Sequence, residues 1–388
     1  MSQHPFRDRV AIVGVGATPY SKNSGVSTLT MALRAIRLAV EDAGLGLDDI
    51  DGVACHRVND SAPASIVAEA IGKQDVHFFL DQFGGGSTSH AIVGAAAMAI
   101  ATGQAECVVC WRSVNARSEV RMGGTGRPAP DQLEFQYQSP FGYAHPPQQF
   151  AMIAREYMLN YGATAEDFGA VAIAQRWYAQ RNERALMRTP LTLDDYLSSR
   201  WIVEPLRLFD CCLETDAAIA LVLTSAERAA DLRQPPVTIS GAMWDSGHTL
   251  FSNRRPDLAI SGAAAASPRL WSQAGVGPDE VDVAQIYDAF TPLVLIQMED
   301  FGFCAKGEAG AFVRAGETGL GGALPVNTHG GHLSEGYVHG LNHCAEAVHQ
   351  LRGECGERQV EGAEVALTTG QGGYVMGNSS AVVLRRGT

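Results

Sequence analysis

Side chains able to move protons gather between residues 287 and 343 of the sequence. They are Tyr287, Asp288, His329, His332, Tyr337, His339 and His343. His339 and His343 have the i, i+4 spacing with which a helix presents two metal ligands, but no His-Glu-x-x-His pattern accompanies them. We therefore expect these histidines to make hydrogen bonds or to be structural, and we predict no metal site.

The cysteines form no recognisable reactive or metal-binding pattern. Cys107-Val-Val-Cys110 has the spacing of half a zinc or redox site, but it lies in an apolar segment without a second pair. Cys211, Cys212 and Cys304 are further candidate nucleophiles, and none of them begins a helix after a glycine-rich turn. We expect structural thiols in a reducing cytoplasm.

Length, charge and hydropathy exclude several classes of protein. The 388 residues suffice for two or three domains, and 46% hydrophobic with 18% charged residues allows a large core. A net charge of −13 argues against a nucleic-acid or anionic-membrane surface. No apolar run reaches the ~18 residues of a membrane helix, and the first residues lack the pattern of a signal peptide. We predict a cytoplasmic location.

An internal duplication organises the chain. Ala43-Gly-Leu-Gly-Leu-Asp-Asp-Ile-Asp51 recurs as Ala274-Gly-Val-Gly-Pro-Asp-Glu-Val-Asp282, and each copy leads into a short strand. We predict an N-terminal half at 1–115, an inserted, mainly helical cap at 116–213, a return strand and helix at 214–235, and a C-terminal half at 236–388. Helices are expected over about 29–43 and near 337–351. Stacked sheets sharing central helices would follow.

The chain resembles thiolases of the sterol-carrier-protein type over essentially its whole length. The resemblance rests on Ala11-Ile-Val-Gly-Val-Gly-Ala-Thr18, Gly84-Gly-Gly-Ser-Thr88, Cys212-Leu-Glu-Thr-Asp-Ala217, Tyr287-Asp-Ala-Phe-Thr291 and Asn327-Thr-His-Gly-Gly-His-Leu-Ser-Glu-Gly-Tyr337. It implies an α/β thiolase fold of two duplicated βαβαβαββ halves in five layers (α-β-α-β-α), with an inserted cap.

Three departures from the thiolase pattern point to one subgroup. The position of the thiolase nucleophile is Phe83, not cysteine, and tyrosine occupies both polar catalytic motifs, as Tyr287 and Tyr337. This combination resembles the thiolase-like aldolases of bacterial steroid side-chain breakdown, often labelled lipid-transfer proteins. In that subgroup the pattern has Tyr where this chain has Phe83 and His where it has Ala289; these two differences bear on the substrate.

The resemblance implies retro-aldol cleavage of a β-hydroxyacyl-CoA, such as a steroid 17-hydroxy acyl-CoA, to a ketone and a short acyl-CoA such as propionyl-CoA. No acyl-enzyme forms in such a reaction, so two proton-transfer groups and an oxyanion site suffice. The aldolases imply Tyr287 and Tyr337 as the acid and base, in an order that the sequence does not fix.

Supporting groups are expected around this pair. Asp288, His329, His332 and His339 could tune the tyrosines. Backbone N–H groups of Gly84, Gly85 and Gly86 at a helix start, or the loop around Gly372, could hold the oxyanion. Arg112, Arg117, Arg121 and Arg127 either meet CoA phosphates or a partner, or belong to a solvated loop.

The resemblance also implies assembly. We expect no cofactor, because CoA belongs to the substrate, and we expect a homodimer joined through strands of the N-terminal half. A small acyl-CoA-binding partner with an OB-fold and a zinc ribbon is expected to complete the site. Two alternatives stay open: a conventional thiolase with a displaced cysteine, and a non-catalytic scaffold that binds an acyl- or sterol-CoA.

Overall fold

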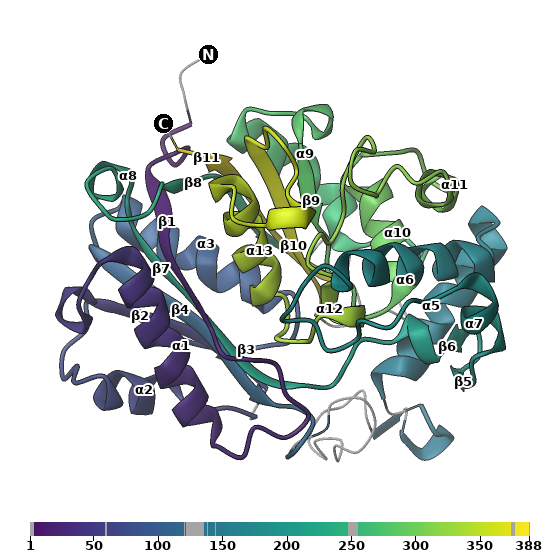
Figure 1. The fold of residues 1–388 in the computed structure, drawn as a ribbon, viewed down its shortest axis with the longest axis horizontal. Coiled ribbons are helices and arrows are strands. Elements are labelled where there is room, and N and C mark those ends of the chain that lie inside the picture. Colours follow the sequence, from purple (N-terminus) through teal and green to yellow (C-terminus); the bar gives the residue numbers. More distant parts are fainter. Residues whose placement is uncertain are drawn as a thin grey trace.

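One mixed sheet of nine strands runs through the molecule (Figure 1). A computed structural model describes residues 4–58, 60–119, 121, 136–137, 139–143, 145–246, 255–373 and 377–387. The strand order is β3-β2-β4-β7-β1-β8-β11-β10-β9. At its centre β1 and β8 share two residue pairs, Ala11 with Thr238 and Ile12 with Val237. The two halves of the sheet are therefore joined by a short seam.

The N-terminal half of the sheet holds five strands. These are β1 (Val10–Ala17), β2 (Gly52–Arg57), β3 (Phe78–Phe83), β4 (Cys107–Asn115) and β7 (Asp216–Ser225). Strand β2 is parallel to β3 and β4, and β7 is antiparallel to β1 and β4. The helices of this half are α1 (Thr28–Ala43), α2 (Ala64–Ala70), α3 (Thr88–Ala101) and α8 (Ala226–Ala229).

The C-terminal half repeats this arrangement. Its strands are β8 (Val237–Asp245), β9 (Val283–Gln285), β10 (Val365–Gly373) and β11 (Asn378–Arg386). A parallel bridge from Ala284 to Val326 stands where the first half has β3. Its helices are α9 (Gly262–Ala274), α10 (Thr291–Asp300), α11 (Ala309–Arg314), α12 (Gly331–Ser334) and α13 (Leu341–Arg352). The predicted duplication is thus present in the strand order.

Buried apolar clusters fill the spaces between five layers. One lies between α1 and α2 and the N-terminal strands, and includes Ile36 and Val109. A second surrounds α3 and α13 between the two halves of the sheet, and includes Ile92 and Leu341. The third covers the outer face of the C-terminal strands beneath α9, α10 and the inserted segment. The predicted α/β thiolase fold is confirmed.

The glycines of the first strand allow helix α1 to lie directly on it. A Cβ atom on Gly14 would overlap the carbonyl oxygen of Ala39, and one on Gly16 would overlap that of Ala35. Ser27 caps the start of α1 and Gly44 ends it in the left-handed conformation. Gly14 and Gly16 therefore serve helix–strand packing.

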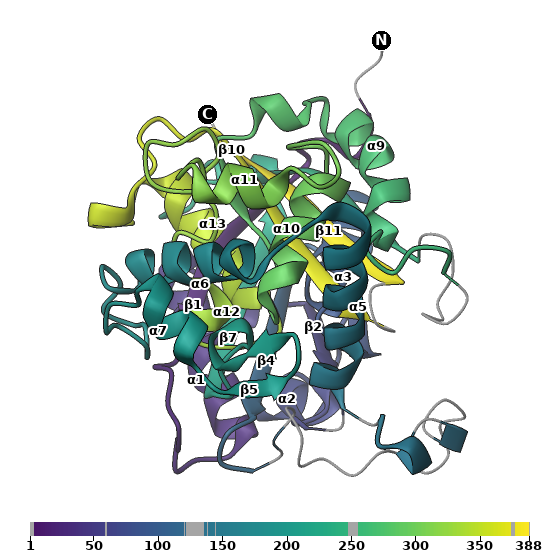
Figure 2. The same ribbon diagram turned by 90° about the vertical axis from the view of Figure 1, so that its right-hand side faces the viewer.

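The inserted segment is mainly helical and covers the C-terminal half (Figure 2). It contains α5 (Pro146–Tyr161), α6 (Ala165–Ala179) and α7 (Leu193–Ser198), with the short strands β5 (Trp201–Val203) and β6 (Leu206–Arg207). Helix α6 packs against α10, α11 and α12. Short 3-10 turns lie at Leu47–Asp49, Ser139–Phe141, Leu208–Asp210, Pro278–Glu280 and Gly356–Arg358.

Two elements differ from the sequence-based expectation. The last long helix begins at Leu341, not near Tyr337, because His339 and Gly340 have φ values of 54° and 96° that interrupt a right-handed helix. The sequence favours a strand from Val76 to Leu80, and in the structure this strand begins at Phe78 and runs to Phe83. Among the described residues, no helix has the length and apolar character needed to cross a bilayer.

Candidate active site

A cavity of about 570 Å³ opens between the inserted segment and the C-terminal ends of the strands. Apolar side chains line much of it: Phe150, Ile202, Leu208, Phe209, Phe290 and Leu333. Phe150 and Phe290 stack with their ring centroids 4.7 Å apart. Tyr287 and Tyr337 also line the cavity. The cavity therefore suits a large apolar ligand that reaches a polar end.

The two tyrosines predicted to act together do meet in this cavity. Their hydroxyl oxygens lie 2.9 Å apart, a hydrogen-bond distance, although their positions are 50 residues apart in the sequence. Tyr287 is 3% exposed and Tyr337 is 7% exposed. The pair is thus a single hydrogen-bonded unit at the buried end of the cavity.

Backbone hydrogen bonds fix both tyrosines. The N–H of Tyr287, just after β9, donates to the hydroxyl of Thr369 on β10, and the carbonyl of Tyr287 accepts from the Gln297 side chain on α10. The Thr215 hydroxyl accepts from the N–H of Tyr337 and donates to its carbonyl. Each phenol is therefore positioned by a neighbouring element of the core.

Both phenols are held in their protonated form. Burial raises the pKa of Tyr287 and of Tyr337 well above the ordinary value for tyrosine, because a phenolate loses its hydration there. Arg112 lowers the pKa of both phenols, and Cys212 raises both. In the free protein the pair consequently carries two protons at neutral pH.

The glycine-rich turns approach the phenols closely. A Cβ atom on Gly86 would overlap the ring of Tyr287 and the carbonyl of Gln371. Gly85, Gly86 and Gly372 line the cavity, and Gly372 has a φ of 101° at an irregularity in the pairing of β10. Gly84 differs from the expectation, since its N–H already donates to the carbonyl of Arg57. The candidate oxyanion donors therefore shift to Gly85 and Gly86.

Asp288 and His332 lie behind the tyrosines and do not line the cavity. The Asp288 carboxylate accepts the backbone N–H groups of His332 and Leu333 at 3.0 and 3.3 Å. Its oxygen also lies 3.1 Å from a ring nitrogen of His332 and 3.1 Å from one of His343. Burial alone would raise the pKa of Asp288, but these two histidines hold it well below its usual range. Asp288 thus fixes the histidines against the phenols.

The same three side chains have the spacing of a ligand set. The donor atoms of Asp288, His332 and His343 lie within 4.8 Å of one another, and all three residues are buried. The carboxylate already accepts the two backbone N–H groups described above. The Asp288 carboxylate therefore has backbone partners and lies close to both rings, and the absence of a metal site stays a prediction.

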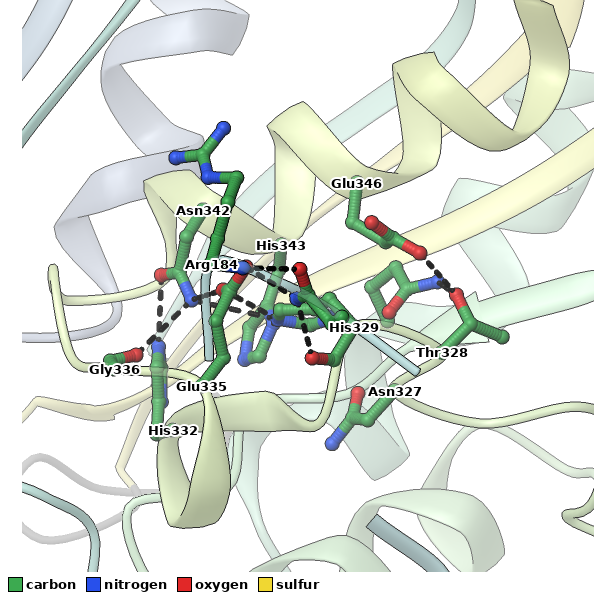
Figure 3. Close-up of polar contacts among 12 residues, drawn as sticks. Arg184, Asn327, Thr328, His329, His332, Glu335, Gly336, Asn342, His343 and Glu346 are labelled. Atoms are coloured by element: carbon green, nitrogen blue, oxygen red, sulfur yellow. Dashed lines mark hydrogen bonds and ion pairs between the residues drawn. The ribbon is translucent and has the colours of Figure 1, made fainter. Parts of the chain in front are cut away.

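His329 does not line the cavity and belongs to a second polar network, which Figure 3 shows. Figure 3 shows the side chains of His329 and Glu335 converging with that of Asn342, which lies in the first turn of α13. The Asn342 amide links the rings of His329 and His332, at 3.4 and 3.1 Å. Glu335 accepts from the Tyr20 hydroxyl and from Asn182, both at 3.0 Å. This network braces the loop that carries Tyr337.

The sequence did not indicate that two thiols line the cavity. Cys211 and Cys212 both face it, brought there by the backbone hydrogen bond from the Cys212 N–H to the carbonyl of Ala289. Burial raises the pKa of both thiols well above the ordinary value, so neither is a thiolate at neutral pH. Burial raises the pKa of Cys304, which does not line the cavity, to about 12.

Cationic side chains line part of the cavity. Lys22, Arg117 and Arg121 line it, and Arg121 forms an ion pair with Glu214. Arg112 differs from the expectation that it meets a CoA phosphate or lies in a solvated loop, because it lies on strand β4 and is fully buried. Arg127 lies outside the described residues.

Of the two positions that depart from the aldolase pattern, one lines the cavity. Ala289 forms part of the wall beside Tyr287, and its small side chain leaves space there. Phe83 is 50% exposed at the end of β3 and does not line the cavity. Only Ala289 is therefore placed to affect which substrate fits.

Comparison with known proteins agrees with this geometry. A family model described as "Thiolase C-terminal domain-like" matches residues 245–386. The chain is 45% identical over 372 residues to a steroid side-chain-cleaving aldolase of Thermomonospora curvata, covering 93% of this chain and 95% of the relative. It is 44% identical over 371 residues to the 17-hydroxy-3-oxo-4-pregnene-20-carboxyl-CoA lyase of Mycobacterium tuberculosis, covering 93% of this chain and 96% of that one.

A solved structure is similar along the whole chain. It is described as "Ltp2-ChsH2(DUF35) aldolase", superposes with a TM-score of 0.92 at 42% identity, and covers 98% of both chains. The protein belongs to the thiolase superfamily, in the family of the steroid side-chain-cleaving aldolases. The resemblance inferred from the sequence is thereby confirmed.

The buried histidines give a testable pH dependence of stability. Burial lowers the pKa of His329 to about 4 and that of His343 to about 3. Below about pH 6.5 the unfolded chain binds protons that the folded chain does not, so each histidine costs ~1.4 kcal/mol of stability per pH unit as the pH falls toward 4. Burial raises the pKa of Asp210 to about 6, so this carboxyl makes the folded state more stable as the pH falls. The contribution of a histidine is therefore measured as the difference between wild type and a variant.

We expect the free energy of unfolding of wild type to fall more steeply between pH 6.5 and 4 than that of His329→Gln. Urea unfolding followed by circular dichroism at several pH values measures this difference. The surface variant His349→Gln serves as the matched control. Parallel stability curves for wild type and His329→Gln would contradict a buried, neutral His329.

Proposed function

We propose that this protein cleaves a β-hydroxyacyl-CoA by a retro-aldol reaction, giving a ketone and a shorter acyl-CoA. The hydrogen-bonded pair of Tyr287 and Tyr337 in an apolar cavity carries this proposal. The names of the two curated relatives, a steroid side-chain-cleaving aldolase and a 17-hydroxy-3-oxo-4-pregnene-20-carboxyl-CoA lyase, support a steroid substrate with a hydroxyl on the carbon that becomes the ketone.

The tyrosine pair can move the proton without a free phenolate. One phenol accepts the proton of the substrate hydroxyl while it passes its own to the second phenol, which delivers a proton to Cα. The Cα–Cβ bond breaks and the β-carbon becomes the carbonyl carbon of a ketone. The electron pair of the broken bond enters the thioester as an enolate, and Cα is then protonated. The high pKa of both phenols favours this relay over a standing tyrosinate.

The cavity accounts for the two ends of such a substrate. The rings of Phe150, Phe290 and Phe209 offer an apolar wall for a polycyclic ketone. Lys22 and Arg117 offer positive charge for the phosphates of the CoA. Gly85 and Gly86 place backbone N–H groups near the tyrosines, where the thioester oxygen gains charge. CoA is part of the substrate, and the chemistry needs no further cofactor.

The dependence on free CoA distinguishes this reaction from thiolysis. A tertiary β-hydroxyacyl-CoA is incubated with the protein, with and without its partner, in the presence and absence of free CoA. We expect the ketone and the shorter acyl-CoA in equal amounts without added CoA, measured by liquid chromatography and mass spectrometry. Cleavage that consumes free CoA would favour a thiolase, and binding without turnover in every condition would favour a scaffold.

Removing either phenolic hydroxyl breaks the relay. We expect Tyr287→Phe and Tyr337→Phe each to lower kcat by ~10²–10⁴-fold, the usual contribution of a proton-transfer group. The ring remains in the core, so the melting temperature should change little. Tyr161→Phe is the matched control, because the Tyr161 hydroxyl hydrogen-bonds Asp257 and does not line the cavity. A tyrosine variant that kept full activity would have no place in the relay.

A partner protein and a second copy of the chain complete our proposal. The description of the similar structure names a DUF35 partner, which supports a partner here too. We propose that this partner carries an OB-fold and a zinc ribbon.

The open edge of strand β3 supports a homodimer. Among the described strands it pairs only with β2, so its other edge is open.

Apolar side chains surround that open edge. Phe79 and Phe83 of β3 are each 50% exposed, and Met98 of α3 is 56% exposed. A two-fold axis beside β3 would pair the two edges and cover these side chains.

We expect a dimer mass for wild type and a monomer mass for the double variant Phe79→Asp, Phe83→Asp, because two buried charges would oppose association. Sedimentation velocity over a range of concentrations measures this. Leu159→Asp is the matched control, since Leu159 is 76% exposed on α5, away from β3. A monomeric wild type, or a dimer unaffected by the double variant, would rule out this interface.

A further inference from the structure

Arg112 is a buried cation that the proton relay does not use. It lies on β4 with none of its surface exposed. Its guanidinium pairs with Asp60 at 2.5 Å and donates to the carbonyl of Ser113 at 3.1 Å. Two further donors reach Nδ1 of His339, at 3.2 Å from Nε and 3.1 Å from Nη2. Two N–H groups of the cation are therefore directed at one atom of one histidine.

That contact determines which nitrogen of His339 carries a proton. Every polar hydrogen of a guanidinium is a donor, and the group has no acceptor, so Nδ1 of His339 must accept. The proton of the neutral ring then lies on Nε2. Burial, and next the charge of Arg112, keep the pKa of His339 well below its usual value, so the ring stays neutral.

His339 stands where such a donor would act on a substrate. It lines the cavity, and its ring centroid lies 4.7 Å from that of Tyr337. Among the described residues, no hydrogen bond uses its Nε2. Its backbone has a φ of 54°, in the left-handed region that residues other than glycine adopt uncommonly. A strained conformation that brings a polar ring to a cavity wall is typical of a functional position.

We propose that Arg112 fixes His339 as the Nε2–H tautomer, so that His339 donates a hydrogen bond to the thioester oxygen as it becomes an enolate oxygen. This inference rests on the proposed function and deepens it. His339 is then a catalytic residue and Arg112 is a positioning residue. The donor complements the N–H groups of Gly85 and Gly86, which line the same cavity.

The tautomer can be measured without any turnover. In protein labelled with ¹⁵N-histidine, the ring signals of His339 are assigned by their loss in His339→Asn. At pH 7 we expect Nδ1 to have the ¹⁵N chemical shift of an unprotonated ring nitrogen and Nε2 to have that of a protonated one. In the double variant Arg112→Gln, Asp60→Asn, which removes both members of the buried ion pair, we expect a mixture of tautomers. A protonated Nδ1 in wild type overturns the proposal even if the protein is an aldolase.

Kinetics test the donor itself. Asn tolerates left-handed backbone and can place an acceptor toward Arg112, but it lacks a donor at the Nε2 position, so His339→Asn should fold. We expect kcat to fall ~10²–10³-fold, as for the loss of one oxyanion donor, with little change in KM. His339→Gln, which can place an N–H near Nε2, should recover part of the loss.

The outcomes separate this inference from the proposed function. If wild type cleaves the β-hydroxyacyl-CoA and folded His339→Asn retains its kcat, His339 is not the donor, while the aldolase assignment stands. If wild type cleaves no such substrate, the proposed function fails. Propionyl-CoA then serves as the probe. A change in the chemical shift of Nε2 on adding propionyl-CoA still supports His339 as a hydrogen-bond donor to a thioester, whereas an unchanged signal overturns that role.

Discussion

The burial of two hydroxyl groups against each other is the constraint on which the site depends. A buried polar group must find a partner, and the phenols of Tyr287 and Tyr337 find one another at 2.9 Å. Gly86 can lie against the ring of Tyr287 only because it has no Cβ. The same burial raises the pKa of the phenols, so that neither is a phenolate in the free protein. The result is a pair of neutral hydroxyl groups that can pass a proton from one to the other.

The duplicated fold explains how residues distant in the sequence reach one cavity. Strands β2 and β9 occupy equivalent places in the two halves, and Tyr287 follows β9. The central helices α3 and α13 lie between the halves, and the loops before them carry Gly86 and Tyr337. Polar networks behind this point, centred on Asp288 and on Asn342, fix the loops so that cavity-facing atoms have defined partners.

Much of the fold and the meeting of the tyrosines could be predicted from the sequence, because the duplication and the family motifs are local patterns. Interactions that depend on three-dimensional packing could not. The approach of Cys211 and Cys212 to the cavity depends on a strand-like contact with Ala289. From the sequence, Arg112 is expected to meet a CoA phosphate or a partner, or to lie in a solvated loop, yet strand β4 carries it into the core. The left-handed backbone of His339, after which the last long helix begins, could not be predicted either, because the residue at that position is not glycine.

The central claim is that phenol chemistry has taken the place of thiol chemistry in a thiolase-type cavity. The most direct test measures turnover of a tertiary β-hydroxyacyl-CoA, without free CoA, by the double variant Cys211→Ser, Cys212→Ser, which replaces the two thiols of the described cavity. Our account predicts a kcat close to that of wild type, since neither sulfur forms a bond with the substrate. Loss of turnover in a variant that still folds and binds the substrate would contradict it.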